Sequence, residues 1–314
     1  MSVATAPPRP IRSVASTRTP IALRRFAGHD SHRESLDRPI RVAHLTDQHV
    51  GRVTPMRIQE LAIDMTNASE PDVVVLTGDF VCHSQVYLED LTSLLKKFAA
   101  PVFAVLGNHD HWSGASGVRR ALNRAGVECL DNANTSITLA GHQRLQIVGI
   151  DDAYTGHADV RRATRGLDPH LPTIGLSHIA EMADSLWYRG VPLILSGHTH
   201  AGQITVARLH ELSIGKLAGH RYVHGLYGRR TKGPDEPRTR TEPIPPHPGH
   251  QLRNKNGAVY VGAGIGAAVV PFRIGERAKR EITLFELGMA PGSLEEHHAE
   301  QVPLPGRARP RKKT

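Results

Sequence analysis

The sequence predicts an α/β fold, because short apolar runs rich in β-branched residues alternate with segments of helical periodicity up to about residue 200. After that point the pattern changes to short strands without long helices. At 314 residues the chain is long enough to bury a sizeable core. These observations predict one large domain over residues 39–290 whose first half is built of βαβ units.

Six apolar runs are expected to form the principal strands, at residues 40–46, 72–78, 102–107, 144–150, 173–178 and 193–197. Two segments between them keep the i, i+3, i+4, i+7 spacing of an amphipathic helix. The first contains Ile58, Leu61, Ala62 and Met65, and the second contains Leu88, Leu91, Leu94, Leu95 and Phe98. Shorter strands are predicted later in the chain, at 203–207, 258–262 and 281–287.

Three segments lack the pattern of packed elements. Residues 1–38, rich in Pro, Ser, Thr and Arg, are expected to be a disordered leader, residues 229–256 a surface loop or insertion, and residues 291–314 a basic disordered tail. The leader contains a twin arginine, Arg24 and Arg25, but charged and polar residues follow it where an export signal needs an apolar region. We therefore expect a cytoplasmic protein.

Composition argues against several classes of protein. No run of eighteen apolar residues is present, so no membrane span is predicted. Cys82 and Cys129 form no CxxC pair, which argues against a zinc finger and a disulfide framework. The net charge of +9 arises from residues 228–255 and 301–314, and aromatic residues make up only 4%, so a nucleic-acid partner is not favoured. No feature of the sequence predicts an oligomeric state.

Polar side chains that can bind metal follow most of the principal strands. In chain order they are Asp47 and His49, Asp79, Asn108, His109 and Asp110, His178, and His198 and His200. Because the carboxyl ends of parallel strands share one edge of a sheet, these residues are expected to meet there. Carboxylate, imidazole and amide groups without thiolate suit Mn²⁺, Fe²⁺ or Zn²⁺. The set is too large for one ion and predicts two divalent ions that share a carboxylate.

The individual motifs differ in specificity. Asp47-x-His49 and Gly78-Asp79, each taken alone, also fit polar loop residues. "GNHD" at 107–110 and "SGHTHAGQ" at 196–203 are more specific, because such residues at a strand end have no role in packing. Gly78, Gly107 and Gly197 are expected to let the chain turn sharply off each strand.

Taken in order, the motifs D-x-H, G-D, G-N-H-D, a lone histidine and G-H-x-H resemble the signature of the calcineurin-like metallophosphoesterase superfamily. The resemblance runs from about residue 40 to 287 and is greatest to a bacterial single-domain, phosphodiesterase-like branch. Ala201 stands here where that branch has a glycine after the last motif. The resemblance implies a four-layer α/β/β/α sandwich of two mixed sheets flanked by helices.

The resemblance also implies a role for each residue. Asp47, His49 and His200 would hold the first ion, Asn108, His178 and His198 the second, and Asp79 would bridge them. His109 would protonate the leaving oxygen or stabilise the transition state, and Asp110 would orient the His109 ring. The implied reaction is hydrolysis of a phosphodiester, or of a phosphomonoester, by a metal-bridging hydroxide on a small-molecule or lipid-linked substrate.

Other functions stay open at this point. One is hydrolysis of the pyrophosphate in a nucleotide-linked lipid precursor, although relatives that cleave acylated UDP-glucosamine commonly carry arginine where this chain has His109. A nuclease is another. A non-catalytic, metal-holding scaffold is a third, but a scaffold is expected to have lost ligands, and all seven positions are present.

The glycine-rich stretch "VYVGAGIGAA" at 259–268 superficially matches a dinucleotide-binding motif. Its glycines lack the GxGxxG spacing and no helix can follow, so we expect a tight turn beside the active site instead. Six further residues are candidates for the mouth of the pocket or for substrate contact: His83, His111, Trp112, Tyr154, His157 and His224.

Overall fold

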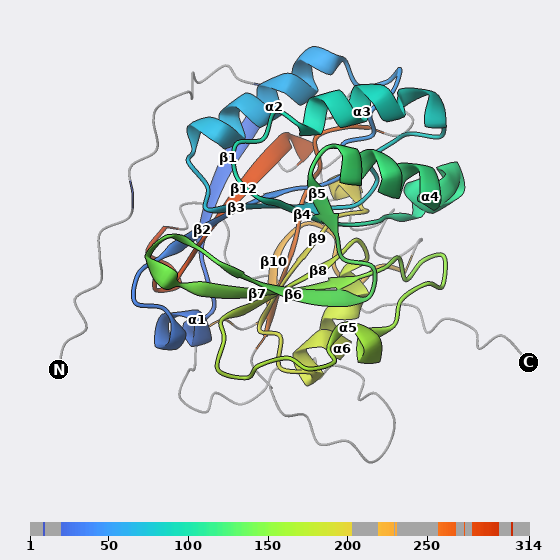
Figure 1. The fold of residues 1–314 in the computed structure, drawn as a ribbon. Coiled ribbons are helices and arrows are strands. Elements are labelled where there is room, and N and C mark those ends of the chain that lie inside the picture. The colour runs from blue at the N-terminus through green and yellow to red at the C-terminus, as the bar shows by residue number, and fades with distance from the viewer. Residues whose placement is uncertain are drawn as a thin grey trace, which may run out of the picture.

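In the computed structural model, two six-stranded sheets pack face to face and helices cover their outer faces (Figure 1). The structure describes residues 9, 20–202, 219–228, 230, 257–267, 273, 278–294 and 303. Both sheets contain parallel and antiparallel pairs. The predicted four-layer α/β/β/α sandwich of two mixed sheets is therefore confirmed.

The first sheet has the strand order β1-β12-β2-β3-β4-β5. Its strands are β1 (Ile21–Ala27), β12 (Arg280–Leu287), β2 (Ile40–Leu45), β3 (Val73–Thr77), β4 (Val102–Val105) and β5 (Val127–Cys129). Strands β2 to β5 are parallel, and β12 runs antiparallel to β2. The carboxyl ends of β2, β3 and β4 consequently share one edge.

The second sheet has the order β10-β11-β9-β8-β7-β6. Its strands are β10 (Gly225–Gly228), β11 (Ala258–Val261), β9 (Leu193–Ser196), β8 (Thr173–Ser177), β7 (Arg144–Ile150) and β6 (Ala133–Thr138). Strands β11, β9, β8 and β7 are parallel, and an antiparallel strand lies at each edge. The principal strands predicted from the sequence are all present in the two sheets.

Three apolar layers hold the sandwich together. In β3, Val73 and Val75 face the core between the sheets, whereas Val74 and Leu76 face the outer helices. Burial on both faces explains why these strands are apolar throughout. Helices α2 (Met56–Ala68), α3 (Leu88–Leu95) and α4 (Asn108–Arg124) cover the first sheet, and α5 (Val160–Ala163) and α6 (Ala183–Tyr188) cover the second (Figure 1).

The expectation of a disordered leader up to residue 38 is wrong for its last part. Residues 21–27 form β1, which pairs in parallel with β12, and α1 (Asp30–Ser35) follows. The twin arginine lies in this strand: Arg24 pairs with Glu281, and Arg25 with Glu286 at 2.6 Å. Both carboxylates are buried, so the arginines compensate charges that β12 carries into the interior. Of residues 1–19, only Arg9 is among the described residues.

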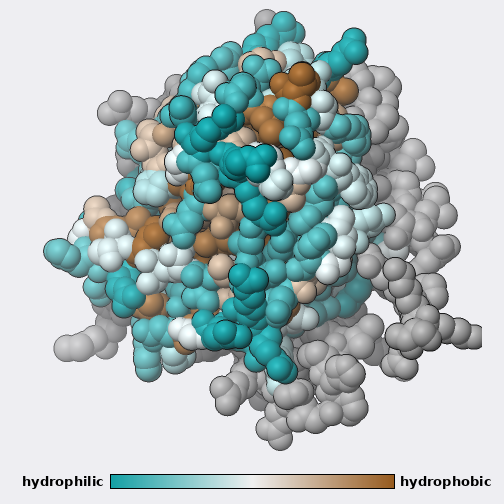
Figure 2. Space-filling view, turned by 45° about the vertical axis from the view of Figure 1, so that its right-hand side comes forward, coloured by the Kyte–Doolittle hydropathy of each residue, from teal (hydrophilic) through white to brown (hydrophobic). Residues whose placement is uncertain are grey.

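Several other predictions fall outside the described part of the chain. The strand expected at 203–207 lies outside the described residues. So does the predicted loop at 229–256, except for Arg230. Of the predicted tail at 291–314, only residues 291–294 and 303 are described. Within the described ranges, no helix combines the length and apolar character needed to cross a membrane. On the face shown in Figure 2, hydrophobic residues form small separate areas among hydrophilic ones.

Candidate metal centre

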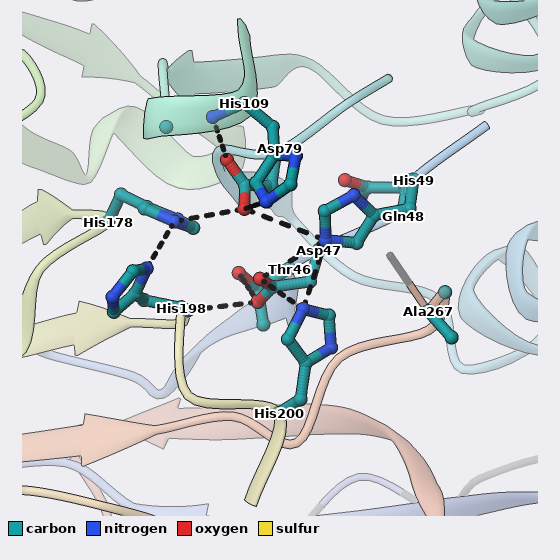
Figure 3. A network of polar contacts seen from close by, with 12 residues as sticks. Thr46, Asp47, Gln48, His49, Asp79, His109, His178, His198, His200 and Ala267 are labelled. Atoms are coloured by element: carbon teal, nitrogen blue, oxygen red, sulfur yellow. Dashed lines mark hydrogen bonds and ion pairs between the residues drawn. The ribbon is translucent and has the colours of Figure 1, made fainter. Parts of the chain in front are cut away.

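The polar residues predicted to meet at the strand ends do lie together, in the loops that follow β2, β3, β4, β8 and β9 (Figure 3). They form two groups of potential metal ligands whose donor atoms lie within 4.8 Å of one another. The first group is Asp47, His49, Asp79 and His200, and the second is Asp79, His178 and His198. Asp79 is common to both and lies between them (Figure 3).

In the first group, two imidazole nitrogens face each other beside two carboxylates. The Nε2 atoms of His49 and His200 are 3.0 Å apart. Asp47 Oδ1 lies 3.3 Å from His200 Nε2, and Asp79 Oδ2 lies 3.5 Å from His49 Nε2. All four side chains are buried or nearly so, so their donor atoms converge on a point shielded from bulk water.

The second group is arranged around His178. Its Nε2 lies 3.3 Å from Asp79 Oδ2, 3.3 Å from His198 Nδ1 and 3.2 Å from Asn108 Oδ1. Asn108, the first residue of α4, thereby joins the second group through its amide oxygen. The same Oδ2 atom of Asp79 therefore approaches histidines of both groups.

Hydrogen bonds to neighbouring groups engage one polar atom of Asp47 and one of His178, so that the other polar atom of each side chain can face the centre. Asp47 Oδ2 accepts hydrogen bonds from Thr46 Oγ1 (2.7 Å) and from the His198 amide (3.1 Å). The Nδ1 atom of His178 donates to the carbonyl of Thr77 (2.7 Å), which directs Nε2 into the centre. Such outer contacts fix the orientation of metal ligands. The role of Thr46 was not predicted, although it directly precedes Asp47 at the end of β2.

Two properties of the site fit a bound cation. Asp47 Oδ1 is buried and accepts no hydrogen bond within the described residues, so it has an unused lone pair. Burial lowers the pKa of His49 and of His200 to about 3, so both imidazoles are neutral and can offer nitrogen lone pairs. Burial opposes a charge on His178, but Asp79 raises its pKa to about 10, which shows how strongly Asp79 favours a neighbouring positive charge.

The loops that carry these residues have unusual backbone conformations. Asp47, His49, Asp79, His198 and His200 all have positive φ, between 44° and 76°. For residues with a Cβ this left-handed conformation costs about 1–2 kcal/mol each. Such strain persists only where the surrounding structure enforces it, and it is concentrated here at the residues that point into one site.

Ala201, which follows His200, shares this strain, with φ of 52° and a fully buried side chain. We expect Ala201→Gly to leave the stability of the metal-free protein within about 0.5 kcal/mol of its original value, because relief of the left-handed strain offsets both the entropy that glycine loses on folding and the loss of a buried methyl group. Urea unfolding measures the difference. Ala68→Gly, at the end of α2, is the matched control and should destabilise instead. Equal destabilisation by both substitutions would contradict the strain argument.

The three glycines at the strand ends have two different roles. Gly78 has φ of 83° and permits the sharp turn that was predicted. Gly107 has φ of −111°, so conformational freedom is not its reason. A Cβ there would collide with the Asp79 carboxylate and the His178 ring, and one at Gly197 would collide with Thr46 and Asp47. The latter two glycines are therefore required by close approach rather than by turning.

The expected contact between Asp110 and the His109 ring is absent. His109 Nδ1 instead donates to the backbone carbonyl of Cys82, at 2.8 Å. The Asp110 carboxylate accepts hydrogen bonds from the backbone N–H groups of Asp79, Phe80, Val81 and Gly107. Burial and the charge of Asp79 raise the pKa of Asp110 to about 7, against the effect of these donors. Asp110, in the first turn of α4, therefore holds the backbone of the loop that contains Asp79.

The other candidates occupy varied positions. The rings of His83 and Trp112 lie 4.6 and 5.0 Å from that of His109, and Tyr154 lies 5.6 Å from His198. His111 bonds to Asp151 and stacks on His157, beside this region. His224 contacts Glu281 in the interior and belongs to neither ligand group.

The glycine-rich stretch forms the predicted turn beside the site. The amide of Ile265 donates to the carbonyl of Thr46 (3.0 Å), and that of Gly266 to the carbonyl of Asp47 (2.7 Å). A Cβ at Gly264 or Gly266 would collide with the loop that contains Asp47. The turn therefore supports the first metal-ligand loop, and the rejection of a dinucleotide motif is consistent with this position.

Known proteins are similar to this chain in sequence. The profile of the calcineurin-like phosphoesterase family matches residues 40–202, which is more than half of the chain. An uncharacterized metallophosphoesterase of Bacillus subtilis, YkuE, is 27% identical over 252 residues, covering 79% of this chain and 78% of the relative. Phosphodiesterase YaeI of Escherichia coli is 30% identical over 200 residues, covering 61% and 72% respectively. A transmembrane protein with a metallophosphoesterase domain from Bos taurus is 30% identical over 276 residues, and the chain spans 54% of its length. The chain therefore belongs to the calcineurin-like phosphoesterase family and is a metal-dependent hydrolase of phosphoric esters.

Proposed function

We propose that the chain hydrolyses a phosphodiester at a centre of two divalent metal ions. The observation that supports this most directly is the position of Asp79, which belongs to both ligand groups and whose Oδ2 lies 3.3 Å from His178 and 3.5 Å from His49. A single carboxylate shared by two ligand groups is the arrangement that two adjacent ions require.

The two ligand groups seen in the structure assign the proposed ligands to the two ions. Asp47, His49 and His200 would hold the first ion, and Asn108, His178 and His198 the second, with Asp79 bridging both. The donor set of imidazole, carboxylate and amide oxygen favours Mn²⁺, Fe²⁺ or Zn²⁺. The choice among these metals, manganese included, and the cytoplasmic location stay predictions.

The bound ions would neutralise the phosphate oxygens and activate the attacking water. His109 is proposed to protonate the leaving oxygen. Because a carbonyl can only accept a hydrogen bond, the contact with Cys82 requires a proton on Nδ1, and Nε2 is then the atom that can deliver a second proton. His109 Nε2 lies 4.0 Å from Asp79 Oδ2, at the edge of the centre, and the side chain is partly exposed. Asp110 would act as a positioning residue for the Asp79 loop.

A diester is proposed as the preferred substrate, and a monoester as the second choice. The name of the Escherichia coli relative, a phosphodiesterase, favours the diester. A complete set of ligands and a candidate proton donor argue against a non-catalytic scaffold. The presence of His109 makes the pyrophosphate of a nucleotide-linked lipid a less favoured substrate. A nuclease would be one kind of phosphodiesterase.

Metal content and turnover together test this function. The purified protein is loaded with Mn²⁺, its metal is quantified by mass spectrometry, and hydrolysis of bis-p-nitrophenyl phosphate and p-nitrophenyl phosphate is measured before and after chelation. We expect two ions per chain and metal-dependent cleavage that is faster for the diester. Two ions without cleavage of either ester would support the scaffold instead, and failure to bind metal under any loading would refute the proposed centre.

A further inference from the structure

Two exposed aromatic side chains stand at the mouth of the metal centre. Among the described residues, the large hydrophobic side chains with high exposure are Val86 (74%), Trp112 (57%) and Tyr154 (47%). Two of these three, Trp112 and Tyr154, lie beside the proposed catalytic groups. An apolar surface left uncovered next to a reaction centre suggests contact with a substrate.

The two rings connect both sides of the centre. The Trp112 ring lies 5.0 Å from that of His109, the proposed proton donor. The Tyr154 ring lies 5.6 Å from that of His198, a proposed ligand of the second ion. Trp112 and Tyr154 are 5.9 Å apart, with their planes at 83°. Both rings therefore lie within reach of a group attached to a phosphorus held at the metals.

The perpendicular arrangement limits what can bind. A planar aromatic group can lie face to face on one ring while its edge meets the face of the other, and both contacts are favourable geometries. Neighbouring flat imidazoles extend the surface, since His83 lies 4.6 Å from His109 and His220 lies 5.0 Å from His198. Among the described residues, ring systems therefore surround Trp112 and Tyr154 beside the proposed catalytic groups.

Building on the proposed function, we propose that Trp112 and Tyr154 form a subsite for a planar aromatic group, such as a nucleobase, carried by the phosphoester. An acyl chain fits this surface less well. A long chain gains affinity by burying each methylene against apolar walls, whereas the described residues offer two half-exposed rings with imidazoles around them. Stacking on aromatic side chains suits a base of any sequence.

Tryptophan fluorescence, read before appreciable hydrolysis of the ligand, can test binding at the subsite. The chain has two tryptophans, and Trp187 is buried, so a change in fluorescence on binding at the mouth reports mainly on Trp112. The Mn²⁺-loaded protein is titrated with AMP and with ribose 5-phosphate, which share the sugar phosphate but differ by the base. The same compounds are then compared as competitors of bis-p-nitrophenyl phosphate hydrolysis.

We expect AMP to quench the fluorescence and to bind about tenfold more tightly than ribose 5-phosphate. Trp112→Ala should abolish the preference in the competition assay, Trp112→Phe should retain most of it, and Tyr154→Ala should reduce it. Val86→Ala, the exposed control, should change neither affinity. Equal affinity for the two compounds would overturn the subsite, as would tighter binding of dodecyl phosphate that depends on Trp112. Failure of the subsite alone leaves metal-dependent diester cleavage intact, whereas failure of the proposed function removes that cleavage whether or not AMP quenches the fluorescence.

Discussion

Asp79→Asn is expected to lower the turnover of bis-p-nitrophenyl phosphate about a thousandfold and to reduce the metal content below two ions per chain. Asparagine keeps the shape of the side chain but removes the charge that both ligand groups share. Turnover would fall because the metal ions, whose positive charge would stabilise the transition state, are held less well, and loss of one such stabilising group typically costs about 10²–10³-fold. Mass spectrometry of the metal-loaded variant, alongside steady-state kinetics, measures both effects.

The matched control for this substitution is Asp64→Asn, which neutralises an exposed carboxylate on α2. It should leave the metal content and the turnover unchanged. Folding of both variants is compared by circular dichroism. An Asp79→Asn protein that still binds two ions per chain would refute the bridging assignment, because neither ion would then depend on the shared carboxylate.

His109→Ala is expected to separate metal binding from catalysis. The ring is 14% exposed, its Nε2 lies 4.0 Å from Asp79 Oδ2, and His109 is absent from both ligand groups, so two ions should still bind. Removing a general acid typically costs 10²–10⁴-fold in rate. We expect a loss of about a thousandfold in kcat for a diester whose leaving group needs protonation, and a much smaller loss for p-nitrophenolate, which leaves readily without a proton.

This dependence on the leaving group distinguishes a proton donor from a structural residue. His170→Ala, which removes an exposed imidazole elsewhere, provides the control and should change neither rate nor metal content. Equal losses for good and poor leaving groups would argue against proton donation. Loss of metal from His109→Ala would instead make the residue part of the metal centre.

The positions of the site residues could be predicted because the chain encodes them locally. Asp47, Asp79, Asn108, His178 and His198 each lie within three residues of the end of a strand, so the strand end fixes the place of the side chain. Parallel pairing of β2 with β3, of β3 with β4, and of β8 with β9 then gathers them. That step follows from general sheet geometry.

Features that depend on distant partners could not be predicted in this way. Strand β1 was predicted to be part of a leader because residues 1–38 are rich in Pro, Ser, Thr and Arg. The glutamates that make Arg24 and Arg25 suitable for a strand lie more than 250 residues away. Strand β6, with the sequence "ANTSIT", has little apolar content and is only partly buried, so it carries no strong pattern.

The hydrogen bonds of Asp110 also could not be predicted from the sequence. Sequence proximity suggested a contact with the neighbouring His109 ring, but hydrogen bonding by a carboxylate is decided by the backbone donors around it. Four such donors surround Asp110, and three of them come from the loop after β3. Likewise, the collisions that require glycine at positions 107 and 197 involve residues in the loops that follow other strands.

The pairing of β1 with β12 has a practical consequence for recombinant work. The composition of the first 38 residues invites their removal for expression or crystallisation, but a truncation at that point would delete β1. The edge of β12 would then be open to other molecules, and Glu281 would lose the guanidinium of Arg24 while staying in the interior. Open edges of this kind promote aggregation. A shortened version should therefore begin before Ile21, and poor solubility of one that begins at Pro39 would reflect the missing strand rather than an unstable metal centre.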